Sequence, residues 1–488
     1  MTNEQYFKQF RDEIIGIDQT FDSPYGLKKI IYADWTASGR MYKPIEDVFM
    51  QNVYGFVANT HTEATVSGKT MTLAYHEAHK IIKKHVNAGN DDIILTPGTG
   101  MTGAVNKFQR ILGLKAPEQL QAQLHLKEED KPVVFVTHME HHSNHTSWLV
   151  TIADVVNLNP DDNGLVDLAD LEKALILYKD RKMIIGAFTA CSNVTGIQTN
   201  YYEMAALLHK YGGYCFVDFA ASAPYININM HPDDETQKLD AIFFSPHKFL
   251  GGPGSSGVLI FDSALYKNKI PEQVGGGTVN WTNPWGEHSF IEDIETREDG
   301  GTPGFLQTIR AALAIKLKEK MGVERILLRE EEILQILFSQ LRNIDKLHIL
   351  ADNIEKRLAI ISFYVEGIHY NLIVKLLNDL FGIQTRGGCS CAGTYGHYLL
   401  QVGHQKSDSI TSSIETGCLI GKPGWVRASF HPTMTDKEIY YICYAIKYVI
   451  ENSELLEKGY DYSEFTNEFT NNKKDHDFME MINNWYKF

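Results

Sequence analysis

Short apolar runs alternate with amphipathic stretches between residues 92 and 250. Apolar residues recur at helical spacing around residues 105–112, 168–178 and 202–211. The apolar runs lie at residues 93–95, 133–136, 155–156, 183–188, 215–217 and 241–244. Continuous apolar strands separated by helices are typical of a mostly parallel sheet that is covered on both faces. The pattern therefore predicts an α/β fold.

The pattern changes near residue 309, which predicts a second domain. Amphipathic stretches at 309–321 and 323–343 lead to two apolar runs, a helix at 370–380 and a last helix near 437–452. Such a mixture is typical of a smaller α+β domain. We therefore expect an N-terminal arm over 1–28, a large domain over 29–308, a small C-terminal domain over 309–453 and a tail over 454–488.

Charge and cysteine content narrow the class of protein. The net charge of −15 argues against a protein that binds phosphate backbones. The first residues lack the apolar core of a signal peptide, and no stretch reaches the roughly 18 uncharged apolar residues of a membrane span. Six cysteines are scattered, and only Cys389 and Cys391 stand close together, which suits a reducing compartment. We expect a cytoplasmic protein that binds neither nucleic acid nor membranes.

Chemistry in such sheets is found just beyond the carboxyl ends of the strands. The run 241–244 ends in Ser245-Pro246-His247-Lys248 and a glycine cluster. A lysine beside apolar walls has its charged form disfavoured, so its amine becomes able to react with an aldehyde cofactor. The neighbouring hydroxyl and imidazole can hold an anion such as a phosphate. Taken alone, the motif fits a solvated lysine in a turn better, because short motifs match by chance.

Two other strand ends offer matching chemistry. Asp218 directly follows an apolar run, where a carboxylate is costly unless it is paired, and a protonated ring nitrogen or a structural cation could pair with it. The loop 96–103 is glycine-rich and leads into a helix, so it could present backbone N–H groups and the Thr102 hydroxyl to a phosphate, or be a plain turn. Asn193 follows a third run and places an amide at the same edge.

A histidine-rich stretch follows the run 133–136. His138, His141, His142 and His145 would form a metal site if they shared one helical face. The stretch lies where a strand turns into a helix, which argues against a shared face. An imidazole here could instead stack on a flat heteroaromatic ring. Lysine, acid, stacking ring and phosphate loop together are the parts that pyridoxal phosphate requires.

Eight short motifs run in order from about residue 30 to 450. They are Glu140-His141-His142-Ser143-Asn144, Ser192-Asn193-Val194-Thr195-Gly196, Val217-Asp218-x-Ala220, Ser245-x-His247-Lys248, Gly275-Gly276-Gly277-Thr278, Gly301-Thr302-Pro303, Arg386-x-Gly388-x-x-Cys391-Ala392 and Val426-Arg427-Ala428-Ser429. With them the chain resembles the class V aminotransferase-like pyridoxal phosphate enzymes of fold type I, and most closely their cysteine desulfurase and selenocysteine lyase branch. The resemblance implies a large domain with a mostly parallel, seven-stranded type of sheet and a smaller α+β domain.

The resemblance also implies a role for each candidate residue. Lys248 would carry the cofactor, Asp218 would pair with its ring nitrogen, His141 would stack on the ring, and Asn193 would lie beside the ring oxygen. The residues implied at the phosphate are Met101, Thr102, Ser245, His247 and, from the other subunit of a homodimer, Thr302. The residues implied at the substrate are Arg427 at the carboxylate, helped by Arg386, Asn59 and His61.

Cys391 matches the family's sulfur-accepting cysteine. It would act with Lys248 and His141 in catalysis, converting L-cysteine to L-alanine and holding the sulfur as a persulfide for a protein sulfur acceptor. The chain departs from the desulfurase pattern at Ala221, where desulfurases carry a glutamine, and in the long loop after Cys391. A class V aminotransferase, or an epimerase or lyase without a catalytic cysteine, is therefore the alternative. A non-catalytic protein that keeps the fold fits the intact motifs least.

Overall fold

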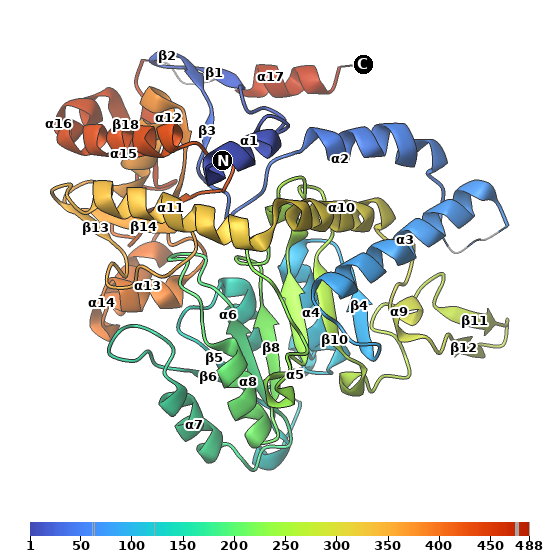
Figure 1. Cartoon of the computed structure of the whole chain (residues 1–488). Helices are drawn as coiled ribbons and strands as arrows, with labels where there is room; N and C mark the ends of the chain where they lie inside the picture. Colours follow the sequence, from blue (N-terminus) through green and yellow to red (C-terminus); the bar gives the residue numbers. More distant parts are fainter. Residues whose placement is uncertain (61, 63, 122, 474–477, 488) are drawn as a thin grey trace. The chain divides into compact units, whose positions relative to one another are not determined.

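The computed structural model describes residues 1–60, 62, 64–121, 123–473 and 478–487, and it divides into two compact units (Figure 1). The large unit is Ala37–Leu327, and the small unit combines Met1–Thr36 with Leu328–Phe488. No helix in these described ranges is both long enough and apolar enough to cross a membrane.

The large unit is built on a seven-stranded sheet, which confirms the predicted α/β fold. Its strand order is β4-β10-β9-β8-β7-β5-β6, and β10 runs antiparallel to both of its neighbours while the other adjacent pairs are parallel. The strands are β4 (Asp92–Leu95), β5 (Val133–Val136), β6 (Asp154–Asn157), β7 (Ile184–Thr189), β8 (Tyr214–Asp218), β9 (Ala241–Phe244) and β10 (Val258–Asp262). Six of them match the predicted apolar runs, and β10 was not predicted.

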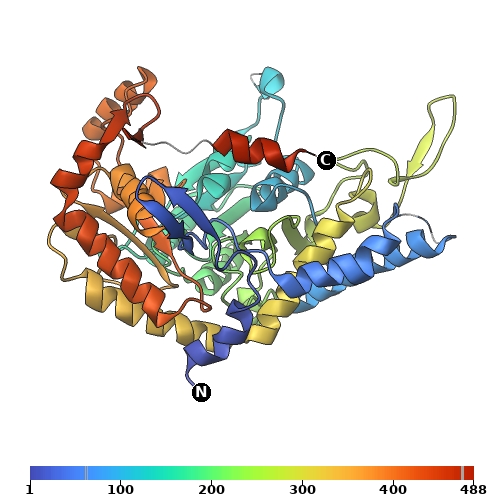
Figure 2. The same ribbon diagram turned by 90° about the horizontal axis from the view of Figure 1, so that it is seen from above.

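Helices pack on this sheet and on one another. Phe108 of α4 contacts Phe216 of β8 and Phe261 of β10, with ring centroids 5.0 and 4.9 Å apart. Helices α3 and α10 pack against each other along their lengths (Figure 2). The main helices are α2 (Lys43–Val48), α3 (Val66–His85), α4 (Gly100–Ile111), α6 (His142–Leu149), α7 (Leu168–Leu177), α8 (Tyr201–Lys210) and α10 (Phe305–Met321). Shorter elements are α5 (Glu118–Gln121), α9 (Ile294–Arg297) and the hairpin of β11 (Val279–Thr282) and β12 (His288–Phe290).

The small unit is α+β, as predicted. Its four-stranded antiparallel sheet has the order β13-β14-β17-β16, and a parallel pair joins β3 to β15. The strands of these two sheets are β3 (Ile31–Tyr32), β13 (Leu347–Ile349), β14 (Ile360–Val365), β15 (Ile383–Gln384), β16 (Arg386–Gly388) and β17 (Trp425–Ser429). Two antiparallel hairpins complete the strands of this unit. One is formed by β1 (Thr20–Ser23) and β2 (Gly26–Lys29), and the other by β18 (Tyr460–Ser463) and β19 (Glu468–Asn471). The helices are α1 (Asn3–Arg11), α12 (Tyr370–Phe381), α13 (Gly393–Leu399), α14 (His404–Glu415), α15 (Asp436–Glu451), α16 (Ser453–Leu456) and α17 (Phe478–Trp485), while α11 (Val323–Leu341) runs across the division at Leu328.

The compact units are divided differently from the expected domains. Helix α10 lies in the large unit because it packs on α3, although residues 309–321 were expected in the small domain. The first 36 residues join the small unit because β3 pairs with β15 and the Ser429 N–H donates to the Ala33 carbonyl (2.8 Å). Compactness alone does not show where a chain can be cut and still fold, so the four expected segments stay a prediction.

Candidate active site

Asp218 is the last residue of β8 and is almost completely buried. Its Oδ1 accepts a hydrogen bond from the Ala220 N–H (2.7 Å), and its exposed fraction is 3%. Burial raises the pKa of this carboxyl to about 6, while the Ala220 N–H and the charge of Lys248 act in the opposite direction. A cationic partner would favour the ionised form. The position therefore suits a protonated ring nitrogen.

Lys248 follows β9 in a tight 3₁₀ turn, Pro246–Lys248, and is half-buried. The turn is fastened by Gly39, whose N–H donates to the His247 carbonyl (2.9 Å). A Cβ on Gly39 would lie 1.9 Å from the Phe249 carbonyl oxygen, so only glycine allows this approach. Burial and the charge of Lys248 lower the pKa of His247 to about 4. The lysine thus interacts electrostatically with both Asp218 and His247.

The start of α4 meets this turn and forms a cradle. The Met101 N–H donates to Ser245 Oγ (2.8 Å), and a Cβ on Gly100 would lie 3.0 Å from both Ser245 Oγ and His247 Cε1. Gly257 closes the other side, because its Cβ would lie 2.1 Å from the Gly100 carbonyl oxygen. A helix N-terminus with a hydroxyl and a ring nitrogen beside it favours an anion.

His141 caps the next helix, α6, beside the same cradle. Its Nδ1 accepts the Ser143 N–H (3.1 Å), and Ser143 Oγ lies 2.7 Å from Thr102 Oγ1, so the starts of α4 and α6 are linked.

The four histidines between residues 138 and 145 do not share a helical face, as expected. His142 is the first residue of α6, whereas His138 precedes the helix and its Nε2 contacts the Gly164 carbonyl (3.2 Å).

Glu140, which was not predicted as a site residue, links the carboxyl ends of β5 and β7 by hydrogen bonds. Its Oε1 accepts hydrogen bonds from the Thr137 hydroxyl (2.7 Å) and the Thr189 N–H (2.8 Å), and its Oε2 accepts one from Asn144 Nδ2 (2.8 Å). Burial raises its pKa to about 8, and the charge of Asp218 adds to this shift. In the sequence, its place next to His141 in the same motif was the signal that could have identified Glu140 as a site residue. Asn193 is buried in the turn after β7, at the same edge of the sheet.

Other predicted residues are more exposed. Thr302 and Asn59 are exposed in loops, and His61 lies outside the described residues.

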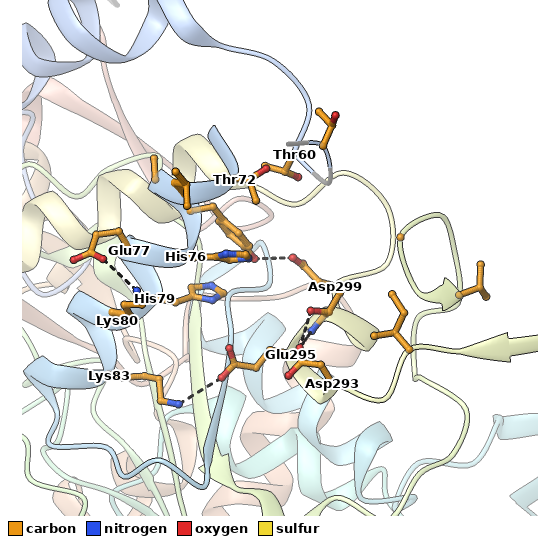
Figure 3. A pocket seen from close by; sticks show the side chains of 18 residues that line it. Thr60, Thr72, His76, Glu77, His79, Lys80, Lys83, Asp293, Glu295 and Asp299 are labelled. Atoms are coloured by element: carbon orange, nitrogen blue, oxygen red, sulfur yellow. Dashed lines mark hydrogen bonds and ion pairs between the residues drawn. The ribbon is translucent and has the colours of Figure 1, made fainter. Parts of the chain in front are cut away.

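A cavity of about 1090 Å³ lies elsewhere in the large unit, between α3 and the segment 277–299 (Figure 3). Tyr75 on its wall donates to Asp299 Oδ2 (2.9 Å). Of the predicted site residues that the structure describes, none lines this cavity.

The small unit holds the two predicted arginines together. Arg427 on β17 and Arg386 on β16 are opposite each other in the strand register, and both bind Asp34. The distances are 2.7 Å from Arg427 Nη2 to Asp34 Oδ1 and 3.1 Å from Arg386 Nε to Asp34 Oδ2. Burial lowers the pKa of Arg427, while Asp34 acts in the opposite direction.

Cys391 lies in the same unit, exposed, on a loop of unusual backbone geometry. Ser390 and Cys391 have φ values of 51° and 58°, and Gly388 before them has 107°. Left-handed conformations in consecutive non-glycine residues are uncommon and cluster at functional sites. Cys391 comes three residues after β16, the strand whose Arg386 lies opposite Arg427. The loop that carries the thiol therefore begins next to the strand pair that holds the two arginines.

Comparisons with known proteins identify the family of this chain and solved structures that share its fold. The family model for class V aminotransferases matches residues 31–442. Proteins named probable cysteine desulfurase from Halalkalibacterium halodurans and Staphylococcus epidermidis are 27% and 28% identical, over 78% and 75% of this chain and 88% and 84% of their own lengths.

Two solved structures have the same fold. A cysteine desulfurase from Thermococcus onnurineus NA1 aligns with a TM-score of 0.72 at 23% identity, covering 91% of this chain and 98% of its own. A cysteine desulfurase from Escherichia coli aligns with a TM-score of 0.70 at 20% identity, covering 92% of this chain and 99% of its own. The chain belongs to the class V aminotransferase family, whose members are pyridoxal phosphate enzymes.

Proposed function

We propose that this protein is a cysteine desulfurase, which converts L-cysteine to L-alanine and keeps the sulfur as a persulfide on Cys391. The observation that carries the proposal is the exposed Cys391 on its left-handed loop, three residues after β16, the strand whose Arg386 lies opposite Arg427. The names of the relatives from Halalkalibacterium and Staphylococcus support it. An aminotransferase would not need a thiol at this position.

The residues of the large unit fit pyridoxal phosphate. The cradle at the start of α4, where a Cβ on Gly100 would fill the space, suits the phosphate, with Met101, Thr102, Ser245 and His247 around it. The buried Asp218 suits the ring nitrogen. The bound cofactor supplies a ring that withdraws electrons from the substrate's Cα.

The chain's own residues then have defined tasks. Lys248 holds the cofactor, and its amine moves the proton at Cα. Asp218 keeps the ring nitrogen protonated, while His141 and Asn193 orient the ring. Of these four, Asp218 and Asn193 are buried and Lys248 and His141 are partly exposed.

The small unit supplies the main residues for substrate binding and sulfur transfer. Arg427, with Arg386 opposite it, binds the substrate carboxylate, and Asn59 and His61 contribute to substrate binding. The Cys391 thiolate attacks the substrate sulfur, so the new S–S bond forms as the S–Cβ bond breaks, and the carbon takes up a proton to give alanine. We further propose a cytoplasmic homodimer in which Thr302 reaches the other subunit's phosphate, and a protein acceptor that receives the sulfur.

The test is release of sulfide and alanine from L-cysteine in the presence of a reductant. The wild-type protein should release both, and Cys391→Ala should release neither while keeping the yellow cofactor. Cys418→Ala is the matched control, since Cys418 is a partly buried cysteine of the same unit. Amino transfer by both the wild type and Cys391→Ala without sulfide would contradict the proposal and favour an aminotransferase. Loss of the cofactor's absorbance in Lys248→Ala checks the cofactor assignment separately.

A further inference from the structure

An acidic side chain joins the two arginines of the small unit. Arg386 and Arg427 face each other across β16 and β17, and each binds a different oxygen of Asp34. Like charges directly opposite each other on neighbouring strands are unfavourable, and the bridging carboxylate relieves this repulsion. Two positive charges and one negative charge leave the group with one positive charge.

Asp34 is held in this place by its neighbours in the chain. The Ser429 N–H donates to the Ala33 carbonyl (2.8 Å), and the Thr36 N–H donates to Ser429 Oγ (2.9 Å). The Trp35 ring stacks on His431, with centroids 4.1 Å apart. These contacts fasten the backbone of residues 33–36 to β17 and the residues after it, which places Asp34 beside Arg427.

We propose that Asp34 determines the charge of the substrate that the arginine pair accepts. The inference rests on the proposed function, in which Arg427 binds the substrate carboxylate. Asp34 offsets one of the two arginine charges, so the two arginines and Asp34 together carry one positive charge. A second acidic group on the substrate is repelled by Asp34. The site therefore favours amino acids with an uncharged side chain over those with an acidic one.

Burial strengthens the interaction of Asp34 with Arg427, whereas the Arg386 side chain is 48% exposed. Arg427 is only 3% exposed, and charges separated from water interact more strongly than charges at the surface. Specificity obtained by repelling the wrong ligand is common where both ligands fit the same contacts. Removing the Asp34 charge should help L-aspartate, with two carboxylates, more than L-alanine, with one.

The experiment measures the dissociation constants of L-alanine and L-aspartate for the cofactor-loaded protein, from changes in its absorbance. In Asp34→Asn the ratio of the L-aspartate constant to the L-alanine constant should fall about tenfold. In Asp34→Asn/Arg386→Gln, which again carries one positive charge, the ratio should return to the wild-type value. Asp18→Asn is the matched control, because Asp18 is an exposed carboxylate of the same N-terminal segment, paired with Lys29, and should leave the ratio unchanged.

Two outcomes would overturn the inference. One is an Asp34→Asn protein that binds cofactor normally and keeps the wild-type ratio. The other is a ratio that stays low in the double variant, because a purely structural role of Asp34 would not be corrected by restoring charge. If Asp34→Asn does not fold, Arg386→Gln is compared with the double variant, because these two proteins differ only in the charge of Asp34. The ratio must then be about tenfold lower in the double variant than in Arg386→Gln.

Arg427→Lys separates this inference from the proposed function. It should weaken the binding of both amino acids, since lysine cannot make the paired contacts of a guanidinium. If it weakens neither, the carboxylate role of Arg427 fails whatever Asp34 does. If it weakens both while the Asp34 variants leave the ratio unchanged, only the inference fails.

Discussion

At the scale of single residues, Asp218 shows how a cofactor site costs stability. Its folded-state pKa of about 6 lies above the ordinary value of 3.8, so the folded protein prefers the protonated carboxyl. As far as this carboxyl is concerned, the free energy of unfolding is therefore highest below the unfolded pKa of 3.8, and it falls as the pH rises through the folded pKa of about 6. The loss reaches at most about 3 kcal/mol above that range.

Asp218→Asn should remove this loss from the cofactor-free protein. Melting temperatures of the cofactor-free proteins should be similar near pH 4, and the variant should melt higher than the wild type above about pH 7. The same variant should bind pyridoxal phosphate more weakly, because it lacks the charge that pairs with the ring nitrogen. A wild-type protein that melts higher than the variant at neutral pH would contradict this account.

Residues that act through local sequence were predictable, and residues that act through distant partners were not. Asp218 ends one apolar strand and Lys248 comes four residues after another, so their positions could be read from the chain. Asp34 and Arg427 are 393 residues apart, and no local pattern shows that they form an ion pair. Glu140 was missed for the same reason, since its bond to Thr189 depends on how β7 lies beside β5.

At the scale of elements, the cradle depends on how closely a glycine lets two segments approach. In Gly257→Ala the new Cβ would lie 2.1 Å from the Gly100 carbonyl oxygen, so the start of α4 must move. We expect a loss of about 1–3 kcal/mol in the free energy of unfolding and weaker cofactor binding. Gly98→Ala is the matched control in the turn that leads into α4, because its Cβ would meet nothing within 4 Å. Equal cofactor affinities in the two variants would contradict the cradle.

The sheet was predictable where strands are continuous and parallel, and less so elsewhere. Strand β10 has four apolar residues, yet it follows a glycine-rich loop rather than a helix, so it lacked the alternation that identified the others. The β11–β12 hairpin exposes most of its residues and offers no apolar run. The hairpin β18–β19 lies in the tail to which no role was assigned, and it is fastened by the Asn467 side chain, which donates to Tyr370 Oη (2.7 Å).

At the scale of the whole molecule, exposed aromatic side chains of the large unit bear on the proposed homodimer. Trp281 and Trp285, in the β11–β12 hairpin of the large unit, are 50% and 84% exposed. Large exposed aromatic side chains are typical of protein interfaces. Thr302 is exposed as well, which suits a residue that serves the phosphate of another subunit.

A mixed dimer tests whether Thr302 acts across this proposed interface. Thr302→Ala alone should weaken cofactor binding about tenfold, the cost of one hydrogen bond to a charged group. In a dimer of one Thr302→Ala chain and one Lys248→Ala chain, one site would combine an intact Lys248 with an intact Thr302 from its partner. Titration of such mixed dimers should therefore show one site of wild-type affinity per dimer. If Thr302 served the phosphate of its own chain, every site would carry a defect, and the wild-type affinity would not return.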